Sequence, residues 1–252
     1  MAAKRRGIGC SVIAVLLVLM LVGAYFIVDS GVRAFAEDQV EREISDALPS
    51  TVTGEITVSI GGASVITQYI AGSFDRVELT APELVAGGVP ASVHLVATGV
   101  PAKTGKPIER VETTLDFTPA ALTTLVQADG AEPGTELIFG DNAVSFAGTL
   151  TLLGIPISYL ATATPTVVGN SLVFTPTNAE VTTEVGSLDV NEIVATIIGQ
   201  QPITICVAQF LPDGLDLTDV NMTTERARIT LESSTLMLTK QSLTTLGSCS
   251  DG

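Results

Sequence analysis

Residues Val52 to Ile60 read VTGEITVSI, in which apolar and polar side chains alternate. Successive side chains of a β-strand point to opposite faces, so this alternation predicts a half-buried strand. Its apolar side is formed by Val52, Ile56, Val58 and Ile60. Similar strand patterns follow in residues 74–80, 91–100, 108–117, 143–153, 157–164, 171–175, 202–210 and 219–238. Sheet therefore dominates the prediction.

Helical spacing interrupts these strands at three places. Val65, Ile66, Tyr69 and Ile70 predict one or two turns, and residues 118–126 predict a helix with Pro119 in its first turn. A third helix is predicted over residues 190–198. Strands with a few helices between them indicate an α+β fold with antiparallel sheet, because a parallel sheet would need strand–helix alternation. The segment 129–135 contains Gly and Pro and predicts a link between two halves, 29–130 and 136–252.

The chain begins with an apolar segment that predicts a membrane anchor. Residues 8–28 are uncharged, and the three basic residues Lys4, Arg5 and Arg6 precede them. Twenty-one helical residues reach roughly 30 Å, the thickness of the hydrocarbon core of a bilayer. The basic flank favours a cytoplasmic tail at residues 1–7 and an extracytoplasmic domain at residues 29–252. We therefore expect a single-pass protein of the plasma membrane.

A cleaved signal peptide is the alternative to an anchor. Such peptides have a shorter apolar region, typically about 7–15 residues, followed by a small-x-small site. Ala34-Phe35-Ala36 fits that pattern, but it lies well beyond the apolar run. It also falls inside a predicted helix, whose apolar residues are Val32, Phe35, Val40, Ile44 and Leu48. The uncleaved anchor is favoured, and cleavage stays open.

Charge and cysteine content restrict the partners and the compartment. Residues 29–252 carry nine basic and 27 acidic side chains, a net charge of −18, which excludes nucleic acid as a partner. Cys206 and Cys249 are the cysteines on the predicted outer side. In an oxidising compartment this pair predicts a disulfide, and two free thiols remain the alternative.

No constellation of side chains in the sequence predicts catalysis or a cofactor. His94 is the only histidine, it lies in a predicted strand, and no Gly-x-Ser-x-Gly motif accompanies it. One histidine and two exported cysteines lack the spacing of a zinc site. Asp213, Asp216 and Asp219 surround Gly214 without the remaining ligands of a calcium loop. We expect a protein that is not an enzyme and binds neither a metal nor a cofactor, with an envelope hydrolase acting through His94 as a rival hypothesis.

The sequence contains more apolar residues than strands with one buried face require. Residues 150–160 read LTLLGIPISYL, so aliphatic side chains occupy both faces of this segment. A two-layer core explains such a pattern, because strands covered on both faces are apolar throughout. An aliphatic groove for a lipid tail is the sharper hypothesis. Its predicted lining is Val65, Ile66, Tyr69, Ile70, Leu152, Ile155, Ile157 and Leu160.

Two blocks of the sequence resemble a known family. VSIGG at residues 58–62, with ITQYIAGSFDRVELTA at residues 66–81, looks like the hallmark block of the LmeA-like phospholipid-binding family of actinobacterial envelope proteins. The helix around AEDQV at residues 36–40 precedes that block as in the family. LPDGL at residues 211–215, followed by LTDV at residues 217–220, resembles the family's penultimate turn. The resemblance extends loosely over residues 30–240.

The resemblance implies an extracytoplasmic protein that binds a phospholipid or glycolipid and is linked to envelope glycolipid assembly. It also implies a curved antiparallel sheet packed around helices, related in architecture to tubular lipid-binding proteins. Rare cations in an acidic domain are the candidates for headgroup contact: Arg76, Lys103, Lys106 and Arg110. The alternative is a non-enzymatic module that docks an envelope protein or polymer through the same apolar surface, with no bound lipid.

Overall fold

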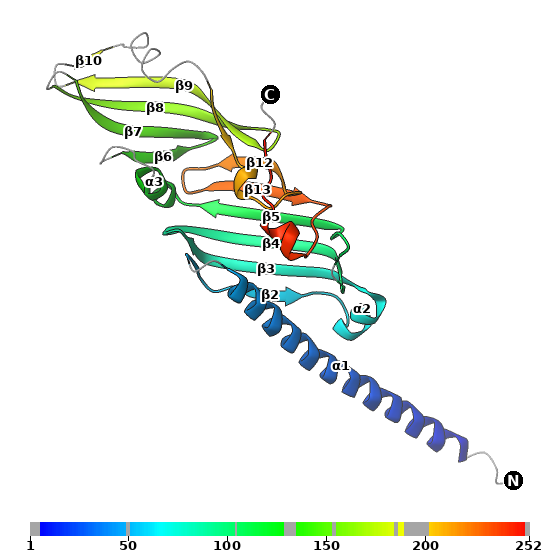
Figure 1. The fold of residues 1–252 in the computed structure, drawn as a ribbon. Coiled ribbons are helices and arrows are strands. Elements are labelled where there is room, and N and C mark those ends of the chain that lie inside the picture. The colour runs from blue at the N-terminus through cyan, green and yellow to red at the C-terminus, as the bar shows by residue number, and fades with distance from the viewer. Residues whose placement is uncertain are drawn as a thin grey trace.

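The computed structural model describes residues 6–48, 51–103, 105–128, 135–152, 155–183, 186–188 and 202–249. These residues form an elongated molecule in which a long N-terminal helix leaves a body of antiparallel sheet (Figure 1). The predicted α+β fold with antiparallel sheet and a few helices is confirmed. The predicted helix 190–198 and the predicted link, except for Thr135, lie outside the described residues.

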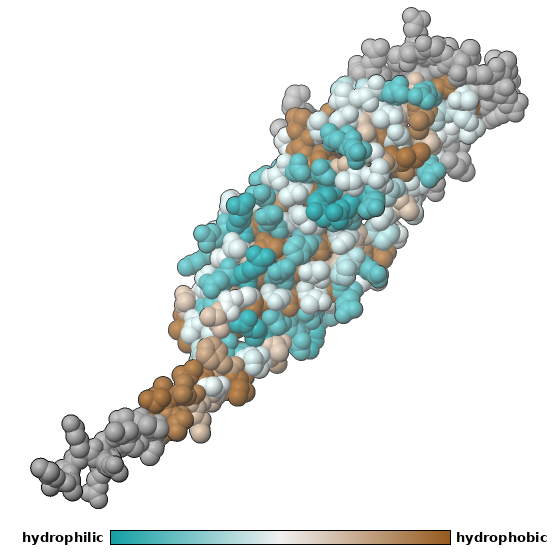
Figure 2. Space-filling view, turned by 180° about the vertical axis from the view of Figure 1, so that it is seen from behind, coloured by the Kyte–Doolittle hydropathy of each residue, from teal (hydrophilic) through white to brown (hydrophobic). Residues whose placement is uncertain are grey.

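Helix α1 (Arg6–Ala47) joins the predicted anchor and the predicted helix after it into one helix of 42 residues, about 63 Å long. The large apolar side chains of residues 15–28 are all exposed, and Figure 2 shows this hydrophobic surface below a body of mixed character. By length and composition α1 is able to cross a membrane. The small-x-small segment 34–36 lies inside this helix.

The first sheet contains strands from both ends of the chain, in the order β1-β3-β4-β5-β13-β12, with β2 also paired to β3. Its strands are β1 (Val52–Thr53), β2 (Thr57–Ile60), β3 (Ser73–Ala86), β4 (Val89–Pro101), β5 (Arg110–Phe117), β12 (Asp216–Met222) and β13 (Ala227–Ser233). The single strand predicted over residues 219–238 is wrong, because Thr223 and Arg226 close a turn with a 2.9 Å backbone hydrogen bond. The segment is a hairpin, and its strand β13 pairs with β5.

The second sheet has the order β10-β9-β8-β7-β6, with β11 also paired to β9. Its strands are β6 (Glu136–Gly140), β7 (Ala143–Leu152), β8 (Ile155–Val168), β9 (Ser171–Thr183), β10 (Gly186–Leu188) and β11 (Ile203–Cys206). The predicted strand 202–210 gives way at Ala208–Phe210 to a short 3-10 helix, η1. Strand β8 contacts β12, so the two sheets meet there.

Among the described residues, the further α-helices that flank the sheets are α2 (Val65–Ala71), α3 (Pro119–Ala128) and α5 (Lys240–Thr244). Helices α2 and α3 confirm the prediction from apolar spacing. Thr118 Oγ1 accepts a 3.2 Å hydrogen bond from the backbone N–H of Ala121, which is the N-cap interaction that holds the start of α3.

The apolar core is divided among several clusters rather than gathered in one. Where the two sheets meet, Leu172 of β9 packs with Leu217 and Leu231 of the first sheet. Near the end of α1, the side chains of Val40 and Ile44 cover the edge of the first sheet. Between these two clusters, Ala97 of β4 and Val111 of β5 are buried beneath Ile108 and Leu236.

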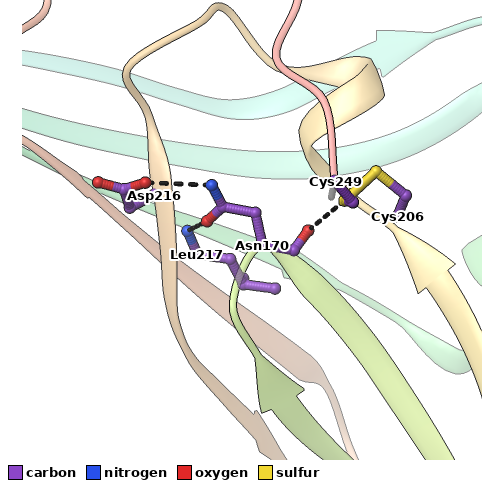
Figure 3. The surroundings of a disulfide bond; sticks show 5 residues. All are labelled: Asn170, Cys206, Asp216, Leu217 and Cys249. Atoms are coloured by element: carbon purple, nitrogen blue, oxygen red, sulfur yellow. Dashed lines mark hydrogen bonds between the residues drawn. A yellow bond between two sulfur atoms is a disulfide. The ribbon is translucent and has the colours of Figure 1, made fainter. Parts of the chain in front are cut away.

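A disulfide links Cys206 to Cys249, as the sequence predicted (Figure 3). The bond closes a loop of 43 residues and contributes roughly 4 kcal/mol in the chain-entropy model. Beside it, Asn170 in the β8–β9 turn donates from Nδ2 to Asp216 Oδ1 at 3.1 Å, and its Oδ1 accepts from the backbone N–H of Leu217 at 2.9 Å. The disulfide and Asn170 together fasten the second sheet and the C-terminal tail to the first sheet.

Candidate functional site

The first sheet carries its apolar side chains on one face, which we call the apolar face. Antiparallel register places two rows of neighbours across five strands. One row is Ala81, Val93, Leu115, Ile229 and Val220, and the other is Leu79, Leu95, Thr113, Leu231 and Leu217. Alternation in the sequence produces this face, because each strand contributes every second residue.

Cover over the apolar face is uneven. Leu231 and Leu217 are 1% and 4% exposed, because Leu172 of the second sheet packs on them. In the other row every residue after Ala81 is half-buried: Val93, Leu115, Ile229 and Val220. Strands lie about 4.8 Å apart, so a row across five strands extends about 19 Å. That distance is close to the roughly 15 Å depth of one leaflet of a bilayer's hydrocarbon core.

Thr113 places a single hydroxyl within this aliphatic surface. Its side chain is 7% exposed and lies between the cross-strand neighbours Leu95 and Leu231. Within the described residues its Oγ1 has no hydrogen-bond partner. An unpaired buried hydroxyl costs about 1–3 kcal/mol, so the apolar face holds one group that would gain from a polar partner.

The opposite face of the same strands is polar, and it carries several ion pairs. Arg228 donates to both carboxylate oxygens of Asp116, at 2.8 Å from Nε and 2.7 Å from Nη2. These bonds lower the pKa of Asp116 and raise that of Arg228, although burial opposes both shifts.

His94 also lies on the polar face. Its Nε2 is 3.4 Å from Glu78 Oε1, and its Nδ1 is 3.3 Å from Thr80 Oγ1. The His94 side chain is 43% exposed. Cross-strand polar contacts of this kind are an ordinary way for neighbours on a sheet surface to pair.

The structure divides the predicted groove lining into two separate groups. Four of the residues are on α2 and four are around the turn from β7 to β8, and Figure 1 places these elements at opposite ends of the body. On α2, Val65 is buried and Ile66 half-buried, whereas Tyr69 and Ile70 are exposed. The two groups do not form one common lining.

The group on β7 and β8 is also split by register. Leu152 pairs with Ile155 beside the turn, and Ile157 pairs with Leu150. Leu160 pairs with Ala147 and Glu180, at an odd spacing from Ile157, and therefore points to the other face of the sheet. Ile157 and Leu160 are both half-buried.

The predicted headgroup cations fall into two pairs with different surroundings. Arg76 binds Glu78 at 3.3 Å, and Arg110 binds Glu232 at 3.1 Å. Lys103 and Lys106 are exposed and follow β4 in a loop beside α2. A 3.0 Å hydrogen bond from the Ala102 N–H to the Gly72 carbonyl joins that loop to the end of α2.

Of the three aspartates singled out in the sequence, Asp216 lies beside Asn170. Asp216 accepts the hydrogen bond from Asn170, while Asp213 and Asp219 are exposed. In the part of the chain that the structure describes, no three or more His, Cys, Asp or Glu side chains are placed to hold a metal ion.

Sequence patterns predicted the strands of the apolar face but did not single out its residues. Val93 and Leu115 stand in alternating segments, yet nothing local shows that they are neighbours or that their cover is incomplete.

A matching family model, described as LmeA-like phospholipid-binding, covers residues 27–232 and so includes both rows of the apolar face. No curated protein and no solved structure matches the chain.

Proposed function

Because the chain belongs to the LmeA-like phospholipid-binding family, we propose that it is a membrane-anchored protein that holds a phospholipid's acyl chains on its apolar face. The half-buried aliphatic row from Val93 to Val220 carries this proposal. An acyl chain laid along this row would cover aliphatic side chains that the protein itself leaves half-buried.

The energy of burial is sufficient for such a ligand. Each buried CH₂ contributes about 0.8 kcal/mol, so eight of them contribute about 6 kcal/mol before the cost of ordering the chain. The hydroxyl of Thr113 is covered in this structure, and a shift of the side chains around it would let it donate a hydrogen bond to an ester oxygen.

The proposed location is the outer side of the plasma membrane in the cell envelope. Helix α1 supports the anchor, and the basic residues before it support a cytoplasmic N-terminus. The Cys206–Cys249 bond supports an oxidising compartment for the body. In this proposal the protein performs no catalysis and supplies lipid to a transfer step or to glycolipid assembly.

Phospholipid retention by two matched variants tests the proposal. Leu115→Asn places an amide on the apolar face, and Thr114→Asn places the same amide one residue away on the polar face. The full chain, purified in mild detergent, is analysed by native mass spectrometry and lipid extraction. We expect wild type and Thr114→Asn to carry phospholipid, and Leu115→Asn to carry at least about tenfold less, because an unpaired buried amide opposes acyl contact.

Circular dichroism and an intact disulfide would verify that both variants are folded. A Leu115→Asn protein that retains as much phospholipid as Thr114→Asn would refute the apolar face as the site. A wild-type chain with no lipid under these conditions would favour an interaction module instead.

A further inference from the structure

Polar side chains along one face of α1, which we call the polar stripe, bind the backbone of the edge strand β2 much as a neighbouring strand would. Glu37 Oε1 accepts a hydrogen bond from the N–H of Ile60, and Glu41 Oε1 accepts one from the N–H of Val58, each at 2.7 Å. Arg33 donates to the carbonyl of Ile60 at 2.8 Å. Residues four apart share one face of a helix, so these bonds fix the direction of α1 relative to the sheet.

The same stripe continues toward the N-terminus and holds α2. Asp29 is 2% exposed and accepts hydrogen bonds from Ser64 Oγ at 2.7 Å and from the N–H of Ile66 at 3.0 Å. One turn earlier, the Tyr25 hydroxyl lies 2.6 Å from Ser64 Oγ. Helix α2 is therefore held against the part of α1 where the apolar run ends.

Helix α2 is the part of the body that lies furthest along α1 toward the N-terminus (Figure 1). Its outer surface is apolar: Ile70 is 78% exposed, more than any other large hydrophobic side chain in the described residues, and Tyr69 is 63% exposed. On α1 itself, Val32 and Phe35 extend exposed apolar surface beyond the predicted span. Exposed apolar side chains of α1 and α2 thus lie at a similar position along the axis of α1.

Cations lie beside this apolar surface in an otherwise acidic body. Lys103 and Lys106 are exposed in the loop that is bonded to the end of α2. The net charge of −18 would not draw the body as a whole to an anionic surface. Phosphate groups of an anionic membrane attract lysines that lie near its surface.

We propose that α2 is an interfacial foot that sits in the membrane from which α1 emerges. Tyr69 and Ile70 enter the boundary between headgroups and acyl chains, where amphipathic aromatic rings concentrate, and the two lysines contact the headgroups. The inference rests on the proposed anchoring through α1 and does not depend on lipid bound at the apolar face.

The absence of tryptophan from the chain allows a direct test. Ile70→Trp creates a protein with one tryptophan, and Tyr69→Trp is a second, more conservative reporter. Val168→Trp is the matched control, because Val168 is 61% exposed on the second sheet at the far end of β8. Leu19→Trp reports the predicted span. Each full-length variant is reconstituted in phosphatidylcholine–phosphatidylglycerol vesicles, with and without bromine on the acyl chains.

We expect the emission of Ile70→Trp and Tyr69→Trp to shift to the blue and to be quenched by brominated lipid, and that of Val168→Trp to remain unchanged. Quenching of Leu19→Trp without quenching at position 69 or 70 would contradict the insertion of α2 in the membrane and would still support anchoring through α1. Equal quenching at positions 70 and 168 would also contradict that insertion. An unquenched Leu19→Trp would overturn the anchoring on which the foot depends.

Discussion

The two faces of the first sheet are built from the same strands but are completed differently. On the polar face, Asp116 and Arg228 satisfy each other. On the apolar face, Leu231 is covered by the second sheet, whereas Leu115 remains half-buried and Thr113 keeps an unpaired hydroxyl. The protein thus pairs its own groups on the polar face, whereas it covers the apolar face unevenly.

Alanine substitutions along the apolar face give the largest expected effect. Leu231→Ala leaves a cavity under the second sheet and should lower the free energy of unfolding by about 3 kcal/mol. Leu115→Ala removes a half-buried side chain and should cost about 1 kcal/mol. Urea denaturation of the full chain in micelles, followed by circular dichroism, measures both. Equal losses would show that the cover is even after all.

Removal of the unpaired hydroxyl is expected to stabilise the lipid-free protein. Valine has nearly the shape of threonine, so Thr113→Val should raise the free energy of unfolding by about 1 kcal/mol. The same substitution should weaken phospholipid retention if the hydroxyl binds an ester oxygen. Thr114→Val on the polar face is the control for strand propensity. A Thr113→Val protein less stable than wild type would show that the hydroxyl already has a partner.

The ion pair of the polar face predicts a smaller effect that depends on pH. Arg228 lowers the pKa of Asp116 below an unfolded value of about 3.9, so its contribution is complete above that pH. It is lost as the pH falls through the lowered folded pKa. Both groups are partly exposed, so Asp116→Asn should cost only about 0.5–1 kcal/mol at neutral pH.

Urea denaturation of wild type and Asp116→Asn at about pH 7 and at about pH 2 measures this difference. The gap between the two proteins should narrow as the pH falls and the carboxylate takes up a proton. A gap of the same size at both pH values would mean that the asparagine disturbs packing rather than charge.

His94 should have the smallest effect of all. Its side chain is 43% exposed and makes only cross-strand contacts, so His94→Gln should change the free energy of unfolding by less than about 0.5 kcal/mol. Phospholipid retention should also be unchanged. A loss of function in this variant would revive the hypothesis of an envelope hydrolase.

Local patterns predicted the elements well, because alternation and helical spacing are properties of neighbouring residues. The strand at Val52–Ile60 formed as two short strands, and α2 and α3 began close to their predicted positions. The pairing of β5 with β13 joins residues more than 100 positions apart, which no local pattern reveals. The apolar face depends on that pairing, and for this reason its centre was not predicted.

The predicted lining failed to come together for the same physical reason. Val65–Ile70 and Leu152–Leu160 are each apolar, but composition does not say on which side of a molecule a segment lies. The polar stripe of α1 is a second example. Asp29, Arg33, Glu37 and Glu41 have helical spacing in the sequence, yet their partners are backbone groups that carry no signature in a side-chain pattern.

The unbroken course of α1 has a mechanical consequence for the body. About 28 Å of this helix lies beyond the predicted span, and carboxylates bonded to β2 prevent a hinge between helix and sheet. In the proposed anchored state, a typical tilt of about 20° would therefore carry the end of α1 sideways by about 10 Å. The body would move with the helix as one rigid unit, so the tilt of α1 would set how far the apolar face lies from the membrane.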